Sequence, residues 1–258
     1  MINGFVEYWA AARLFVSGGN PYSPAELFKT QEAIGWNEAA ALLMWNPPWA
    51  LSFIWPLGFL DYDTAQFIWF LLHTLIVFIG AQLLWRIYDG PAVTARYAAF
   101  AVLTFAPLYF VLLLGQIGPL ILLGLIVFLL AVKKQSWMLA GAGLALVALK
   151  PHLLHLFWLA LFLWFIKARH WRSLLGMAVG AGAAMVFPLL LNREIYARYI
   201  DLYSSAGIVR PEDWATASLG TALGAILGIE NIWLRVLPTI GGVLWLLWYW
   251  RGHAAGWN

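Results

Sequence analysis

The chain has 258 residues, of which 63% are hydrophobic and 10% are charged. Apolar windows such as residues 65–84 and 173–191 are long enough to cross a bilayer, so this composition excludes an ordinary soluble domain and predicts a polytopic membrane protein. A net charge of +3 is too small to indicate a nucleic-acid partner, and the absence of cysteine excludes disulfides, zinc thiolates and thiol nucleophiles.

The first predicted element is an amphipathic helix at the N-terminus. Aromatic and aliphatic side chains from Phe5 to Val16 cluster on one helical face, whereas Glu7 and Arg13 project elsewhere. The Ser-Gly-Gly-Asn-Pro run of residues 17–21 ends this helix, and a second short helix follows. We expect the first helix to lie flat on the outer membrane surface, with Glu7 as a solvated charge or as a partner of Arg13.

A proline-rich segment separates these helices from the first clear span. Residues 51–60 are apolar, follow Asn46-Pro47-Pro48 and contain Pro56. A segment of this length cannot cross a bilayer as a straight helix. We therefore expect a re-entrant segment or a short broken span.

Apolar stretches with helical periodicity make up most of the remaining chain. They cover residues 65–84, 95–113, 118–132, 137–149, 152–166, 173–191 and 231–250. Gly141 and Gly143 in the shortest stretch predict close packing among neighbouring helices. The predicted fold is therefore all-α, a polytopic transmembrane helix bundle of about seven to eight spans with external amphipathic helices.

The spans suggest four regions. Residues 1–64 form an external loop with the proline-rich segment, and residues 65–191 form a six-span bundle. Residues 192–230 form a second external loop, and residues 231–258 form the last span with a short cytoplasmic tail.

Basic residues fall on one side of the membrane when the spans alternate. They are Arg86, Arg96, Lys133, Lys134, Lys167, Arg169, Arg172 and Arg251. The positive-inside rule assigns this side to the cytoplasm. The outer side then receives residues 1–64, the turn at Gln116, the turn at residues 150–152 and the loop 192–230. An outer N-terminal segment without a preceding span predicts either unaided translocation or a fragment of a longer chain.

Polar residues interrupt the apolar sequence at two of these outer turns. Gln116 lies between two spans, and Lys150-Pro151-His152 lies between two others. Because charge inside a membrane protein is costly and often marks a functional site, we expect a functional site at these turns. The alternatives are that Lys150 extends to the interface while His152 packs in the bundle, and that Gln116 either binds a sugar or closes a tight turn.

Five blocks of sequence carry a family resemblance in their order along the chain. They are residues 5–13 with 17–22, 45–49 with 56–57, 115–119, 149–152 and 214–219. Over almost the whole chain they resemble glycosyltransferase family 87, the polyprenol-phosphate-sugar-dependent transferases of the C-type superfamily. The resemblance implies transfer of a mannose-like hexose or a pentose from a polyprenyl-phosphate donor to a glycan or glycolipid acceptor, on the outer face of a bacterial plasma membrane.

This reaction needs a carboxylate that accepts the acceptor hydroxyl proton and cationic groups that hold the departing phosphate. We expect Lys150, with His152 or Arg13, to bind the donor phosphate. We expect the sugar or acceptor to contact Tyr8, Asn46, Gln116 and Trp214. The outer loop 192–230, with its aromatic and polar residues, is either an acceptor site or an interfacial helix.

The sequence departs from the family at the expected base. Members carry an aspartate immediately before the block that begins at Phe5, where this chain has Gly4. Glu7, one helical turn further on, is the nearest carboxylate and the candidate catalytic residue. Members also have spans before and after those seen here, which predicts a fragment or a degenerate copy. An inactive relative that binds lipid-linked sugar and a lipid or solute transporter therefore remain alternatives.

No cofactor is predicted. Asp61 and Asp63 are separated by one residue, a spacing more typical of a turn that caps a span than of a divalent-cation site.

Overall fold

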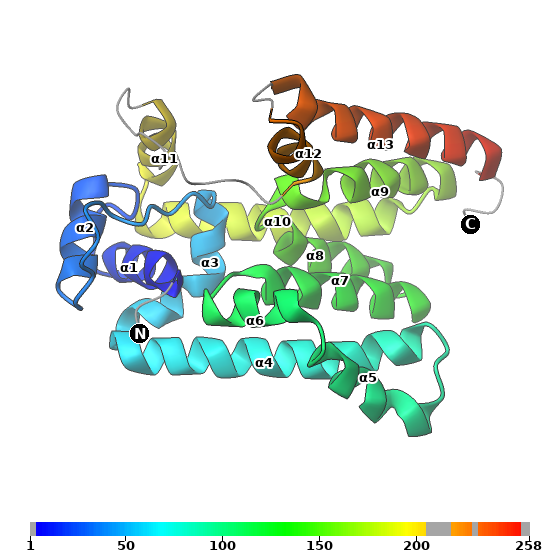
Figure 1. Cartoon of the computed structure of the whole chain (residues 1–258), viewed down its shortest axis with the longest axis horizontal. Helices are drawn as coiled ribbons and strands as arrows, with labels where there is room; N and C mark the ends of the chain where they lie inside the picture. The colour runs from blue at the N-terminus through cyan, green and yellow to red at the C-terminus, as the bar shows by residue number, and fades with distance from the viewer. Residues whose placement is uncertain (1–3, 205–217, 229–231, 254–258) are drawn as a thin grey trace. The chain divides into compact units, whose positions relative to one another are not determined.

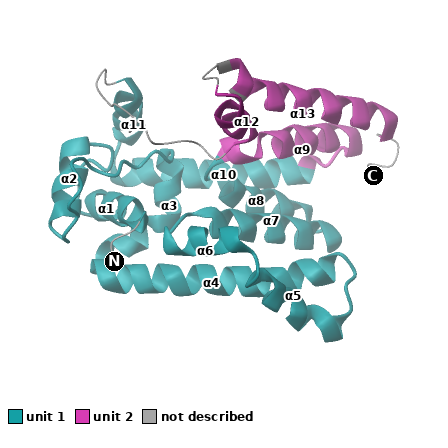
Figure 2. Ribbon diagram, viewed as in Figure 1, with its two compact units in different colours: residues 1–150, 172–204 teal, residues 151–171, 205–258 magenta. Residues whose placement is uncertain are grey.

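The computed structural model describes residues 4–204, 218–228 and 232–253, and every regular element in these ranges is a helix (Figure 1). The predicted all-α class is confirmed. The chain divides into two compact units (Figure 2): unit 1 comprises residues 1–150 and 172–204, and unit 2 comprises residues 151–171 and 205–258.

Helix α1 (Phe5–Val16) is enclosed on nearly all sides, and Arg13 is its exposed exception. The expectation of a helix lying flat on the surface is therefore wrong. Ala10, Ala11 and Ala12 present little bulk, so the rest of unit 1 approaches the helix closely from the faces that a surface helix would leave to water. Helix α2 (Pro24–Glu32) follows, and Ser23 caps it by accepting a hydrogen bond from the Glu26 N–H.

The proline-rich segment consists of three short helical pieces. They are η1 (Pro48–Ala50), α3 (Leu51–Ile54) and η2 (Trp55–Phe59). None is long enough to cross a membrane by itself. The segment packs against α1 so closely that a Cβ atom on Gly58 would meet the Ala12 carbonyl.

The described residues hold three helices long and apolar enough to span a membrane. They are α4 (Tyr62–Ile87), the continuous η4 (Pro151–Leu154) and α9 (His155–Ala168), and α10 (Trp171–Leu191). A fourth is possible by the same measure if α5 (Ala95–Val102) and α6 (Ala106–Leu113) count as one span broken by a 66° bend. Pro107 lies in the first turn of α6, where its missing N–H explains the break in the helix.

Within the described residues, three or four of the seven to eight predicted spans meet this measure of length and hydropathy. Two further predicted spans form apolar helices of only 16 and 11 residues, α7 (Gly118–Lys133) and α8 (Trp137–Val147). The short helix η3 (Ala92–Thr94) precedes α5, and α11 (Ile195–Ser204) follows α10. In unit 2, α12 (Leu219–Leu227) and α13 (Ile232–His253) complete the described helices.

Small residues bring α7, α8 and α10 into close contact, as predicted for Gly141 and Gly143. A Cβ atom on Gly141 would meet the Ser173 carbonyl, and one on Gly143 would lie 2.8 Å from Val127. Helices in lipid associate largely through such van der Waals contacts. The hydrophobic effect does not drive them together, because the surrounding lipid chains are as apolar as the helix surfaces.

Replacing Gly141 with alanine should therefore destabilise the protein by about 1–3 kcal/mol, the usual range for overpacking. Gly182→Ala is the matched control, since Gly182 also lies in a helix but a Cβ there meets nothing within 4 Å. Thermal unfolding of the detergent-solubilised variants measures both changes. Equal unfolding temperatures for the two variants would contradict this packing.

Candidate functional site

The turn that carries Gln116 is fixed by α4 and by the start of α1. Gly115 has a φ of +63°, a left-handed conformation that glycine adopts without strain. The Trp69 indole N–H donates a hydrogen bond to the Gly115 carbonyl at 2.9 Å. Phe5 packs so closely on this turn that a Cβ atom on Gly115 would lie 2.6 Å from the Phe5 Cβ.

The proline-rich block positions Lys150 through the backbone that precedes it. Trp49 donates its indole N–H to the Ala148 carbonyl at 2.9 Å, and the buried Asn46 amide donates to the Leu149 carbonyl at 3.2 Å. The Lys150 ammonium then donates to Gln116 Oε1 at 3.3 Å. Three blocks that lie far apart in the sequence therefore meet at one lysine.

Glu7 lies in the interior of unit 1, where its residue is 7% exposed. Burial raises the pKa of the Glu7 carboxyl from 4.5 to about 7, although the Lys150 ammonium and the Tyr8 hydroxyl act to lower it. Burial also lowers the pKa of Lys150, and the charge of Glu7 opposes that change. The expectation of a solvated or Arg13-facing Glu7 is wrong, because this carboxyl interacts with Lys150.

The Tyr8 side chain lies beside Glu7 and is fully buried. Its ring stacks on Trp69 with centroids 5.7 Å apart. Burial, and secondly the nearby Glu7 carboxylate, raise the pKa of the Tyr8 hydroxyl well above its ordinary value. This hydroxyl has no protein partner with full hydrogen-bond geometry among the described residues, so a polar group is available beside the carboxylate.

Gly4 lies directly against the turn of Gln116. A Cβ atom at this position would lie 2.5 Å from the Leu114 carbonyl oxygen and 3.3 Å from the Gln116 side-chain nitrogen. Because real Cβ contacts are not that short, any residue larger than glycine requires the backbone to move. The position of the expected aspartate is thus filled by the 114–116 turn.

The remaining predicted site residues are Arg13, His152 and Trp214. Arg13 donates a hydrogen bond from Nη1 to the Gly58 carbonyl at 2.8 Å and lies over the Trp9 ring at 6.0 Å. His152 is exposed in η4 and belongs to unit 2, whereas the cluster lies in unit 1. Trp214 lies outside the described residues.

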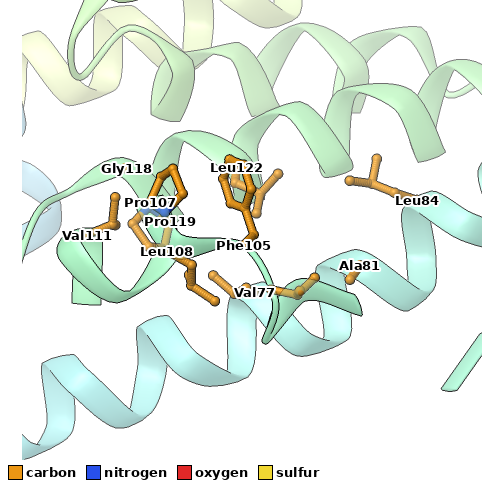
Figure 3. A pocket seen from close by; sticks show the side chains of 11 residues that line it. Val77, Ala81, Leu84, Phe105, Pro107, Leu108, Val111, Gly118, Pro119 and Leu122 are labelled. Carbon is orange, nitrogen blue, oxygen red and sulfur yellow. The ribbon is translucent and has the colours of Figure 1, made fainter. Parts of the chain in front are cut away.

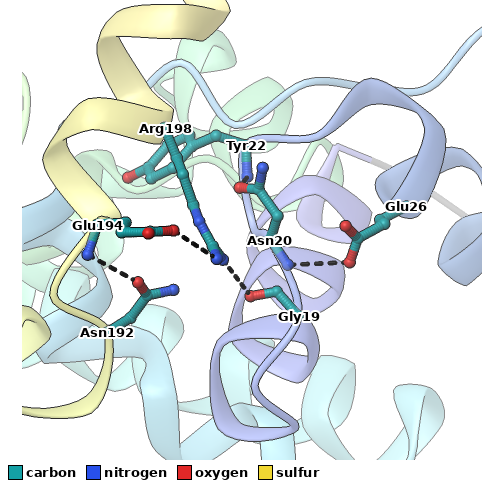
Figure 4. Close-up of polar contacts among 7 residues, drawn as sticks. All are labelled: Gly19, Asn20, Tyr22, Glu26, Asn192, Glu194 and Arg198. Carbon is teal, nitrogen blue, oxygen red and sulfur yellow. Dashed lines mark hydrogen bonds and ion pairs between the residues drawn. The ribbon is translucent and has the colours of Figure 1, made fainter.

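Helix α11 attaches the described part of the predicted loop 192–230 to the N-terminal region (Figure 4). Arg198 donates to the Gly19 carbonyl at 3.3 Å and pairs with Glu194 at 3.1 Å. Tyr199 packs edge-on against Tyr22 with centroids 5.1 Å apart. Tyr22 in turn donates to the Asn46 carbonyl at 3.1 Å, so α11 supports the block that positions Lys150.

An apolar cavity of about 400 Å³ lies among α4, α6 and α7 (Figure 3). Val77, Leu108 and Leu122 are among the residues that line it, and none of its lining side chains carries a polar group. It therefore offers no acid, base or phosphate ligand.

Asp61 accepts the Thr64 N–H at 2.9 Å and caps α4, which confirms the predicted capping turn.

A comparison with protein-family models shows to which family the chain belongs. A model of glycosyltransferase family 87 matches residues 45–257. The chain belongs to glycosyltransferase family 87. Searches of curated proteins and of solved structures gave no match.

Membership of family 87, together with the apolar helices, makes the chain an integral membrane protein of a glycosyltransferase family, and this family suggests a lipid-linked sugar donor and an acceptor in general. The matched range contains Gln116 and Lys150 but begins after Glu7. Reasoning from sequence alone missed the burial of Glu7. The three alanines of residues 10–12 were the available signal, since they leave α1 without a polar face wide enough for a surface helix.

The raised pKa of Glu7 predicts a specific dependence of stability on pH. Between pH 4.5 and about 7 the folded state holds this proton more tightly than the unfolded chain, so stability falls as pH rises through that window. The contribution amounts to roughly 3 kcal/mol. Glu7→Gln should remove it, whereas Glu38→Gln, at an exposed position, should not. Unfolding temperatures measured across this range test the prediction, and an unchanged slope in Glu7→Gln would contradict it.

Proposed function

We propose that the protein transfers a sugar, a mannose-like hexose or a pentose, from a polyprenyl-phosphate donor to a glycan or glycolipid acceptor on the outer face of a bacterial plasma membrane. The observation that carries this proposal is the buried cluster of Glu7, Lys150 and Gln116. It joins a carboxyl with a pKa near neutrality to a partly buried cation, the pair of groups that this transfer needs.

In the proposed reaction the acceptor hydroxyl attacks the anomeric carbon while the bond from that carbon to the phosphate oxygen breaks. The ionised Glu7 carboxylate accepts the hydroxyl proton, and the polyprenyl phosphate leaves with the bonding electron pair. Lys150 holds the departing phosphate, and Gln116 orients the lysine through its side-chain oxygen. Tyr8 and Asn46 remain proposed contacts for the sugar, with Asn46 also holding the Leu149 carbonyl.

The positions of the helix ends support the proposal that Glu7, Lys150 and Gln116 lie on one side of the membrane. Helices α4 and α7 both begin near the cluster, at Tyr62 and Gly118. At their other ends Lys133 forms an ion pair with Asp89 at 2.9 Å, within the two basic loops expected in the cytoplasm. The cluster therefore lies at the end expected to face outward.

A catalytically inactive relative is the second candidate, and the replacement of the aspartate by Gly4 favours it. Such a protein would bind the lipid-linked sugar at Lys150 without transferring it. Uptake of a solute into vesicles without any transfer would instead support a transporter.

Substitution of the two ionisable groups separates these candidates. Glu7→Gln should lower transfer by about 10²–10⁴-fold, and Lys150→Ala should lower it by at least about 10²-fold, with part of the activity kept in Lys150→Arg. The measurement is transfer of labelled sugar from a polyprenyl-phosphate donor in reconstituted vesicles. In the wild type kcat/KM should fall as pH drops through about 7, because Glu7 must be ionised to accept the proton.

Lys134→Ala is the matched control, since Lys134 is exposed in the opposite loop and should leave transfer unchanged. Wild-type rates in Glu7→Gln would contradict the assigned base. Donor binding without transfer in the wild type would establish the inactive relative.

Gly4→Asp, which places the aspartate expected from the family at position 4, should not raise the rate of transfer. The Cβ atom of Gly4→Asp would collide with the Leu114 carbonyl and displace the turn that carries Gln116, so transfer should fall below that of the wild type. Gly4→Ala carries the same Cβ without a carboxylate and should show a similar loss. Higher activity in Gly4→Asp than in both the wild type and Gly4→Ala would refute this steric argument.

A further inference from the structure

Helix α1 carries a second polar face besides the one that holds Glu7. Arg13 follows Glu7 by six residues, which places it about 9 Å further along the axis and about 120° around it. Trp9 and Arg13 are four residues apart and therefore share a face. The Arg13 guanidinium lies over the Trp9 ring, so these two side chains form the second face.

A cavity of about 490 Å³ opens on this second face. Trp9 and Tyr62, both buried and packed edge to face with centroids 5.4 Å apart, are aromatic residues of its lining. The exposed Arg13, Lys29 and Asp61 also line it. We name this cavity the Arg13 pocket. It combines aromatic surface with two cationic side chains from different helices.

The charges in this pocket are not neutralised by one another. The Asp61 carboxylate accepts the Thr64 N–H at the start of α4 and keeps its negative charge, so Arg13, Lys29 and Asp61 together give the lining a net charge of +1. Arg13 uses one N–H on the Gly58 carbonyl, and a guanidinium has five such donors. Lys29 forms no ion pair within the described ranges of the chain. The pocket therefore retains cationic donors that a ligand with negative charge can engage.

The depth of the pocket in the membrane is set by α4. Asp61 and Tyr62 form the first end of this 26-residue apolar helix, where a span meets the lipid headgroups. Tryptophan and tyrosine favour this depth because their rings face apolar chains while their polar atoms reach water. The Trp9 indole N–H is already satisfied by the Leu60 carbonyl at 3.0 Å, which holds the ring in place.

From these contacts we infer that the Arg13 pocket binds the phosphate-bearing headgroup of an anionic phospholipid of the surrounding bilayer. Arg13 and Lys29 hold the phosphate, and the Trp9 and Tyr62 rings contact the glycerol and the first methylenes of the chains. A bound lipid joins α1, α2 and the start of α4 at the membrane surface. The site is separate from the proposed transfer site, because Arg13 and Glu7 lie about 120° apart around α1.

The test is a titration of the purified full chain in non-ionic detergent with short-chain phosphatidylglycerol, followed by native mass spectrometry. Phosphatidylcholine, which has no net charge, is titrated in parallel. We expect the wild type to bind phosphatidylglycerol at least about tenfold more tightly than phosphatidylcholine. Arg13→Gln should lose about tenfold in affinity for phosphatidylglycerol, and Lys29→Gln several-fold.

Two controls make the outcome decisive. Lys29→Gln keeps the test valid if Arg13→Gln fails to fold, because Lys29 is exposed and makes no ion pair in the described residues. Lys134→Gln removes the same charge at the other end of the molecule and should leave the affinity unchanged. Equal affinity for the two lipids, or equal losses in Lys29→Gln and Lys134→Gln, would overturn the proposal.

The lipid site and the transfer reaction are tested independently. Glu7→Gln should lower transfer by about 10²–10⁴-fold but leave phosphatidylglycerol binding unchanged, since Glu7 does not line the Arg13 pocket. Retained lipid binding in a protein without any transfer activity would refute the proposed function alone. Loss of the lipid preference in an active enzyme would refute the lipid site alone.

Discussion

The burial of one carboxyl group, that of Glu7, governs the arrangement of unit 1. A carboxylate removed from water is strongly destabilised unless a cation or hydrogen-bond donors compensate it. Lys150 supplies the opposite charge, and it does so from a position fixed by Gln116 and by the backbone of residues 148 and 149. Because this compensation is incomplete, the carboxyl retains a pKa near neutrality, a property suited to proton transfer.

Side-chain donors that reach isolated backbone carbonyls make this arrangement possible. Trp69 binds the Gly115 carbonyl, Trp49 that of Ala148, and Arg13 that of Gly58. Each of these carbonyls lies where a helix ends or breaks, and an unsatisfied carbonyl there is costly inside a membrane protein. The tryptophans that composition alone associates with membrane interfaces thus have a second role, since they stabilise the irregular backbone that forms the site.

The sequence allowed correct prediction of the helical class, of the close contact at Gly141, and of the two polar turns, because these depend on composition and local pattern. It did not show that Gln116 and Lys150 are bonded to one another, since their contact depends on how α7 and α8 pack. It also placed Glu7 and Arg13 together on a solvated face. Helical spacing puts the two residues on different faces of α1, and the fold then packs η2 against Ala12 and directs Glu7 toward Lys150 and Arg13 toward the Gly58 carbonyl. An apolar stretch gives hydrophobicity but not the length of the helix that forms, as α8 and the bent α5 and α6 demonstrate within the described residues.

The closeness of Gly4 to the 114–116 turn gives a physical reason for the proposed assignment of Glu7, in place of an aspartate at position 4, as the base. The Gln116 turn approaches the start of α1 to the distance that only glycine allows, and this approach lets Gln116 reach Lys150. A carboxylate at position 4 and a turn in this position exclude each other sterically. A carboxylate one helical turn further along α1 meets no such conflict, and it lies within range of the same lysine. In the proposed reaction, the contact at Gly4 therefore explains why the base is Glu7 and not a residue at position 4.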